Sequence, residues 1–227
     1  MAMTPEKAYD FCVKMNNSKR NKHLESVIMA DFRCFELYLR NIVGPNYWDI
    51  CENPLLKNRF ESYIRHLEEF DLGRDLDFEA VLTEPKDLYL YTYKVLKSRW
   101  IEKEDIIKTD LCQACFYAQK VLKNRWPEIE PLIVNDTNLA TYYASYVMNC
   151  RWPEAEIAVL NSPYAAAYYA ELVIKGRWLE VEDFIRSAPH SAFYYALYVL
   201  ECRWPEAEDM IKTDLYSWTQ YKAEFGI

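Results

Sequence analysis

The hexapeptide RWPEAE, which stands at residues 151–156 and recurs unchanged at 203–208, decides the fold of this 227-residue chain. Its Arg-Trp pair returns every 26 residues without an insertion. The copies stand at 99–100, 125–126, 151–152, 177–178 and 203–204. A tyrosine keeps the same period at positions 91, 117, 143, 169, 195 and 221. Because several residue types recur in one register over five copies, the sequence contains a tandem repeat.

One unit of the repeat reads as two helices joined by a corner. The apolar residues of 140–147 follow the i, i+3, i+4, i+7 spacing of an amphipathic helix, and Asp136 before them is a good N-cap type. Pro153 is unfavourable inside a helix but suits a first turn, so we expect it to begin a second, shorter helix. Glu154 and Glu156 then fall in that first turn, where carboxylates interact favourably with the helix dipole. The Arg-Trp pair is expected to pack the corner.

Such a unit cannot bury its apolar stripe alone, so we expect an all-α solenoid of stacked αα-hairpins over residues 71–227. The first unit is degenerate, because Asp75 replaces the tryptophan, and the last is truncated to the single helix of 215–227. Residues 1–70 lack the consensus and form a predicted helical N-terminal cap or subdomain. Its predicted helices begin at Thr4-Pro5, span 23–43, and run from Asn53-Pro54 to about Phe70, with a loop at 16–23.

Composition and charge exclude several classes of protein. The N-terminus lacks the apolar core of a signal peptide, and no apolar run reaches the ~18 residues of a membrane helix. Seven cysteines without a secretion signal fit a reducing compartment, so a cytoplasmic location is expected. The net charge of −8 lies entirely in residues 71–227, which argues against nucleic-acid binding there.

The sequence contains no motif for catalysis, a cofactor or a metal. It has no glycine-rich phosphate loop, no GxSxG and no HExxH, and only four glycines in all. Cys112 and Cys115 form a lone CxxC without the further ligands of a zinc site, which favours buried thiols. The Arg, Trp and Glu columns recur five times in register, whereas an active site is needed once. We therefore interpret them as structural, and expect no enzyme activity and no cofactor.

Positions beside the repeated residues are the candidates for partner binding. An aromatic row precedes the repeated tyrosine, and we expect it to pack between units or to line a protein-binding groove. It consists of Phe116, Tyr142, Tyr168 and Tyr194. Positions that vary between repeats would supply specificity, among them Ser145, Glu171, Leu197, Lys175 and Glu201. A basic loop could add a second contact through Lys19, Arg20 and Lys22.

The intact RWPEAE strings at 151–156 and 203–208, each preceded by a tyrosine-rich helix, resemble short helical repeats of accessory proteins encoded by tailed bacteriophages. The resemblance covers about residues 85–227. It departs at 99–104, 125–130 and 177–182, and in the first and third of these Ile101 and Leu179 occupy the proline column. The resemblance implies a repeat scaffold without a defined activity. It also implies a class of proteins that often act by binding host proteins, including those of immune and toxin systems.

Three functional hypotheses follow. The leading one is a non-enzymatic protein-binding scaffold, which in a phage would inhibit or modulate a host defence protein in the bacterial cytoplasm. The second is an acidic mimic of nucleic acid that blocks a DNA- or RNA-binding protein, motivated by the charge of residues 71–227. The third is an enzyme in residues 1–70 with the repeats as a targeting arm, for which no motif exists.

Overall fold

The computed structural model describes residues 4–14, 27–28, 34, 38, 60–69, 71 and 73–227. All regular structure in these residues is helical, which confirms the predicted all-α class. The chain divides into two compact units, residues 1–107 and 108–227. This division falls inside the predicted repeat region. The predicted boundary at residues 70/71 marks a change of sequence pattern and stays a prediction.

Unit 1 contains the predicted first helix and the degenerate repeat unit. Its elements are α1 (Pro5–Lys14), α4 (Phe60–Glu69), α5 (Leu76–Val81), α6 (Pro85–Tyr91), the π-helical η4 (Thr92–Leu96), the 3-10 turn η5 (Ile101–Lys103) and α7 (Glu104–Ile107). Helix α1 begins at Pro5, and the Lys7 amide donates to the Thr4 hydroxyl at 3.4 Å, as expected of an N-cap. The predicted loop at 16–23 and most of the predicted helix at 23–43 lie outside the described residues.

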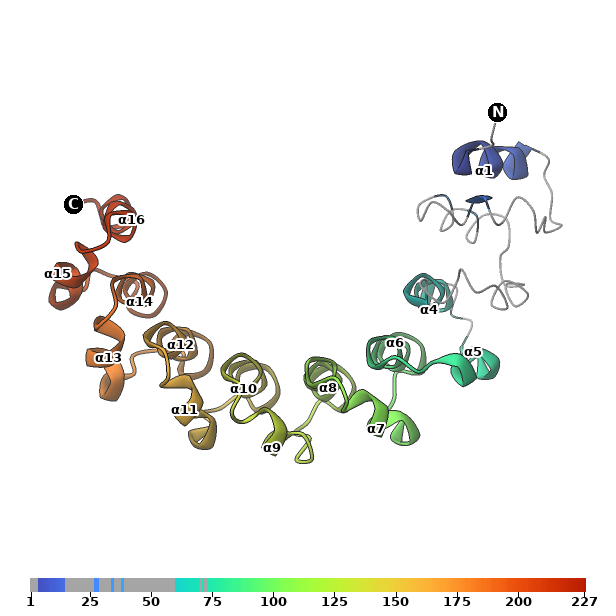
Figure 1. Ribbon diagram of the computed structural model, residues 1–227, viewed down its shortest axis with the longest axis horizontal. Coiled ribbons are helices and arrows are strands. Elements are labelled where there is room, and N and C mark those ends of the chain that lie inside the picture. Colours follow the sequence, from blue (N-terminus) through green and yellow to red (C-terminus); the bar gives the residue numbers. More distant parts are fainter. Residues whose placement is uncertain are drawn as a thin grey trace. The chain divides into compact units, whose positions relative to one another are not determined.

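Unit 2 alternates longer first helices with shorter second helices (Figure 1). The first helices are α8 (Leu111–Tyr117), α10 (Thr137–Tyr143), α12 (Pro163–Tyr169), α14 (Pro189–Tyr195) and α16 (Leu215–Phe225). The second helices are α9 (Glu130–Ile133), α11 (Pro153–Val159), α13 (Glu182–Arg186) and α15 (Glu208–Ile211), of which the last two follow 3-10 turns at η9 (Leu179–Val181) and η11 (Pro205–Ala207). Within this unit each kind of helix forms a row of its own, so two rows lie side by side.

The corner at Pro153 follows the sequence prediction, whereas after Pro127 and Pro205 the second helix begins three residues later, at Glu130 and Glu208. Helix α11 begins at Pro153, and Asp136 caps α10 by accepting hydrogen bonds from the amides of Asn138 and Leu139. A 3-10 turn precedes the helix both where the proline column holds Leu179 and where it holds Pro205, and the corner persists in both. The chain therefore turns at the same place in each unit whether or not a proline is present.

Every first helix from α6 to α14 ends in a π-helical turn, which the sequence did not indicate. These turns are η4, η6 (Ala118–Leu122), η7 (Ala144–Met148), η8 (Ala170–Ile174) and η10 (Ala196–Leu200). A left-handed residue then closes each helix, namely Lys97, Lys123, Asn149, Lys175 and Glu201, with φ between 51° and 57°. None of the five is the glycine that this conformation favours.

The core of unit 2 consists of the repeated tyrosines, tryptophans and alanines. Tyr117, Tyr143, Tyr169, Tyr195 and Tyr221 are completely buried, and so are the alanines that follow the first four. The tryptophans of the corners are also buried, which confirms the packing prediction for both columns. Val147, predicted in the buried stripe, is only half-buried. It lies in a π turn, where i→i+5 bonding rotates side chains away from α-helical positions.

Candidate binding surface

A hydrogen-bonded network fixes each corner between two repeats. The Trp178 amide donates to the Tyr195 hydroxyl at 2.7 Å, and that hydroxyl donates to the Glu182 carboxylate at 3.0 Å. Arg177 holds the same carboxylate through two hydrogen bonds of 2.8 and 2.7 Å. The Trp178 ring meanwhile packs on Tyr169 of the preceding first helix, with ring centroids 5.4 Å apart. The corner therefore ties three successive helices together.

The electrostatics of the corner suit a structural role. The hydrogen bond from Arg177 lowers the pKa of Glu182, and burial raises the pKa of Tyr195, so the carboxylate is charged and the phenol neutral at pH 7. The same arginine fork recurs at Arg74–Glu79, Arg99–Glu104, Arg125–Glu130, Arg151–Glu156 and Arg203–Glu208. The arginine column and the second of the two glutamate columns are committed to their own corners, which agrees with the structural interpretation of these two columns.

The degenerate first unit keeps the network without its tryptophan. The Asp75 amide donates to the Tyr91 hydroxyl at 2.9 Å, and that hydroxyl donates to Glu79 at 2.8 Å. The Asp75 side chain caps α5 by accepting from the Phe78 amide, and the Phe78 ring packs against Tyr91. Since the tryptophan contributes only its backbone amide to the network, aspartate can replace it there.

A cavity of about 540 Å³ lies between two corners of unit 2. It is lined by Arg125, Pro127, Glu130, Pro131, Val134, Met148, Cys150, Arg151, Trp152, Pro153 and Glu154. Both arginines in this lining are already forked with a glutamate, so the cavity offers a ligand no uncommitted positive charge. Among the described residues, no group of His, Cys, Asp and Glu could hold a metal ion.

The first helices of unit 2 carry six neighbouring tyrosines, here called the tyrosine surface. These are Tyr142, Tyr146, Tyr164, Tyr168, Tyr194 and Tyr198. Their ring contacts form two groups. Tyr142 contacts Tyr146 with ring centroids 4.9 Å apart. In the next two repeats, Tyr164 lies 6.5 Å from Tyr168 and 5.1 Å from Tyr194, and Tyr194 lies 4.6 Å from Tyr198. Tyr198 is 50% exposed, Tyr146 45%, Tyr164 43% and Tyr168 38%.

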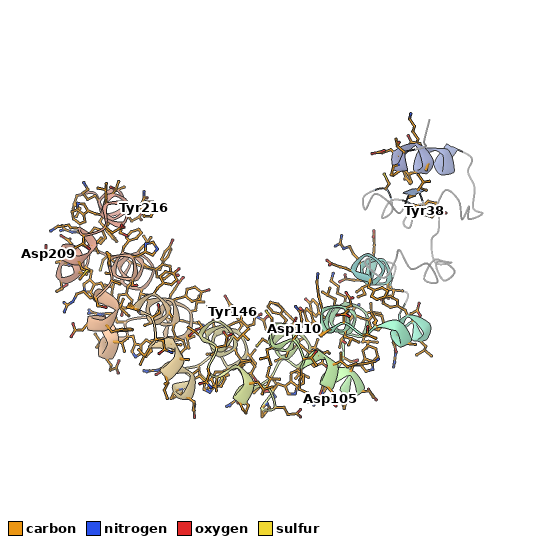
Figure 2. All side chains as sticks on the ribbon, in the orientation of Figure 1. Tyr38, Asp105, Asp110, Tyr146, Asp209 and Tyr216 are labelled. Atoms are coloured by element: carbon orange, nitrogen blue, oxygen red, sulfur yellow. The ribbon has the colours of Figure 1, made fainter. Side chains whose placement is uncertain are left out.

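Tyr146 of the tyrosine surface lies on the side of the first helices away from the second helices. Figure 2 shows Tyr146 and Tyr216 on this side, whereas Asp209 lies on the other side, beside α15. Helix α10 and the π turn after it hold no charged residue, so this part of the surface is aromatic and neutral. The acidic second helices thus face away from the tyrosines.

Hydrogen bonds between neighbouring first helices hold two of these rings in place. The Tyr142 hydroxyl donates to the Gln119 side chain at 2.5 Å, and the Tyr194 hydroxyl donates to the Glu171 carboxylate. Burial raises the pKa of Tyr168, and the proximity of Tyr146 and Glu171 raises it further. The surface is therefore preorganised by contacts of its own.

The predicted aromatic row both packs between repeats and contributes to this surface. Phe116 and Tyr142 meet edge to face with ring centroids 5.2 Å apart, and Tyr168 and Tyr194 lie 6.3 Å apart. Sequence reasoning missed Tyr146, Tyr164 and Tyr198. Each of these three tyrosines is four residues from a tyrosine of the predicted row. Because residues four apart share a helix face, this spacing could have identified them.

The structure places the predicted variable residues in several environments. Ser145 is only 6% exposed and its hydroxyl donates to the Leu172 carbonyl at 3.1 Å, so it belongs to the packing between helices. Lys175 and Glu201 are exposed, but their backbone closes the helix in the left-handed conformation. Leu197 and Glu171 are half-buried. The basic residues Lys19, Arg20 and Lys22 lie outside the described residues.

Comparisons with known proteins give no relative. No family model matches the chain, and neither the curated proteins nor the solved structures contain a match to it. Across the described part of the chain, none of the helices has the length and apolar character needed to cross a membrane.

Proposed function

We propose that residues 71–227 form a solenoid of αα-hairpin repeats and that the protein is a non-enzymatic scaffold whose tyrosine surface binds another protein. The observation that carries this proposal is a set of six tyrosines on three successive first helices, four of which are 38–50% exposed and four of which are joined by ring contacts across two repeats. A run of exposed aromatic rings on one face of a repeat array is typical of an interaction site.

Tyrosine suits protein recognition for physical reasons. Its ring supplies a large contact area at a small cost in side-chain entropy, and its hydroxyl can hydrogen-bond at the wet edge of an interface. On this surface the rings already support one another, and Tyr142 and Tyr194 are held by hydrogen bonds. Binding would therefore order few side chains, which leaves more of the interaction free energy for affinity.

The charges favour this function over a nucleic-acid mimic. A mimic needs carboxylates spaced along a surface and available to a basic groove. Of the two repeated glutamate columns, one is withdrawn from this role because Glu130, Glu156, Glu182 and Glu208 are each forked by an arginine, which leaves the exposed column at 128, 154, 180 and 206. The resemblance to phage accessory proteins makes a protein of a bacterial host, such as a defence protein, the proposed partner. An inhibitor or modulator of this kind would act in the host cytoplasm.

Affinity capture from a bacterial lysate, followed by mass spectrometry, tests the proposal. The test variant combines Tyr146→Ala and Tyr198→Ala, since both rings are exposed. The control combines Leu132→Ala and Ile157→Ala, which remove exposed apolar side chains from second helices. We expect a specific partner with the wild type and the control, and its loss with the tyrosine variant. Equal recovery by all three proteins would contradict the proposal.

A further inference from the structure

One carboxylate on the tyrosine surface has no cation to neutralise it. Glu171 lies in η8, and among the described residues no Lys, Arg or His nitrogen comes within 4.0 Å of it. Its hydrogen-bond donor is the Tyr194 hydroxyl, which satisfies one of its two oxygens. Since a carboxylate accepts several hydrogen bonds, Glu171 keeps unused acceptor capacity at a half-buried position.

This carboxylate lies beside a cluster of aromatic rings. Tyr194 contacts it directly, and the rings of Tyr164 and Tyr168 lie 5.1 and 6.3 Å from the Tyr194 ring. The faces of aromatic rings carry negative charge density and attract cations, most strongly where water is partly excluded. The rings and the carboxylate therefore create a region of negative potential, and the His190 ring stacks on Tyr164 beside it with ring centroids 5.9 Å apart.

The protein already satisfies a cation in this way at one of its own corners. Arg151 lies over the Trp178 ring, 5.3 Å from its centroid, while it forks the Glu156 carboxylate through two hydrogen bonds of 2.8 Å. A planar guanidinium can stack on a ring and bind a carboxylate with two donors at once, which the ammonium of lysine cannot do. The cluster around Glu171 has the ring and the carboxylate of this arrangement and lacks the guanidinium.

We propose that Glu171, together with Tyr164, Tyr168 and Tyr194, binds an arginine side chain of the partner protein. This inference rests on the proposed function and names the chemistry that the tyrosine surface recognises: a segment of the partner that presents arginine. The guanidinium would stack on the exposed ring of Tyr168 and donate to the free oxygen of Glu171. Net attraction between this acidic unit and a basic segment would add to the rate of association.

The repeat supplies an internal comparison for this assignment. Two repeats earlier, Phe116, Tyr142 and Gln119 occupy the positions of Tyr168, Tyr194 and Glu171. There the tyrosine hydroxyl donates to a neutral amide, so an aromatic pair at the equivalent positions, with ring centroids 5.2 Å apart, lacks the carboxylate. We expect an arginine to prefer the cluster at Glu171 over the cluster at Gln119.

Titration of the full-length protein with defined peptides tests the proposal. The probes are blocked peptides of glycine and serine with spaced arginines, and matched peptides in which citrulline, the neutral isostere of arginine, replaces each arginine. Binding is followed by NMR of the tyrosine rings. We expect the arginine peptide to shift the Tyr164, Tyr168 and Tyr194 signals and the citrulline peptide to leave them unchanged. Glu171→Gln should weaken binding by about fivefold, because it removes charge but preserves shape.

Two further variants decide between a specific site and general attraction. Glu224→Gln removes an exposed carboxylate from α16 and should leave binding unchanged. Gln119→Glu should create a second responsive cluster at Phe116 and Tyr142. The proposal is overturned if the arginine peptide shifts no ring of the cluster, or if Glu224→Gln weakens binding as much as Glu171→Gln. Partner capture that is lost with the tyrosine variant but unchanged by Glu171→Gln would overturn this inference alone and leave the proposed function standing.

Discussion

Removal of one buried hydroxyl tests the account of the corners. Tyr195→Phe deletes the acceptor of the Trp178 amide and the donor to Glu182 while it keeps the buried ring. The Trp178 amide hydrogen bond is buried, so the amide would lose its acceptor where water does not readily replace it. Arg177 would remain on the Glu182 carboxylate, which limits the loss at that end.

The expected destabilisation is about 2–3 kcal/mol. An unsatisfied buried donor costs about 1–3 kcal/mol, and the lost hydrogen bond to a carboxylate adds to this figure. Tyr198→Phe is the matched control, because this hydroxyl lies on an exposed ring one turn away on the same helix. A surface change of this kind is expected to stay within about 0.5 kcal/mol.

Urea unfolding followed by circular dichroism at 222 nm measures both variants. Because repeat proteins can unfold in segments, hydrogen exchange of the Trp178 amide provides a local measurement that needs no two-state assumption. We expect faster exchange at this amide in Tyr195→Phe and no change in Tyr198→Phe. Stability of Tyr195→Phe within about 0.5 kcal/mol of the wild type, with unchanged exchange, would refute the network as a source of stability.

Three further predictions concern charge, backbone and thiols. The pKa of Glu182 is lowered below its ordinary value of 4.5, so the stability that its charged form contributes is present above about pH 4.5 and is lost as the pH falls. The destabilisation caused by Glu182→Gln should therefore shrink in unfolding curves measured below that pH. A difference in stability between wild type and variant that stays constant with pH would contradict this. Lys123 has a left-handed backbone, which glycine adopts without the steric cost that other residues carry. Because this gain slightly exceeds the extra entropy that glycine loses on folding, Lys123→Gly should stabilise the protein by about 0.5 kcal/mol in urea unfolding. Lys123→Ala should give no stabilisation. Burial raises the pKa of the Cys115 thiol to about 12, whereas Cys150 is exposed. Mass spectrometry after brief iodoacetamide treatment should therefore find Cys150 modified before Cys115. The reverse order would argue against the burial of Cys115.

Much of the repeat unit was predictable because each helix is a local pattern. The 26-residue period aligned five copies, so the corner at Pro153 and the burial of the Tyr and Trp columns followed from spacing alone. The prediction was weaker for residues at the edges of the helix faces. Ser145 was expected to vary on the surface, yet it is buried against the next first helix. Its position lies in a π turn, where angles derived from about 3.6 residues per turn no longer apply.

The sequence by itself determined the all-α class, the two helices of each unit and the structural role of RWPEAE, because a pattern repeated in register reports on local backbone and burial. Only the tertiary structure decided which side chains of different repeats meet. The pairing of Trp178 with Tyr195, 17 residues later, depends on how neighbouring hairpins stack. So does the meeting of Tyr164, Tyr168 and Tyr194 around Glu171. Stacking is set by the summed packing of many residues across successive helices, and no single stretch of sequence contains that information.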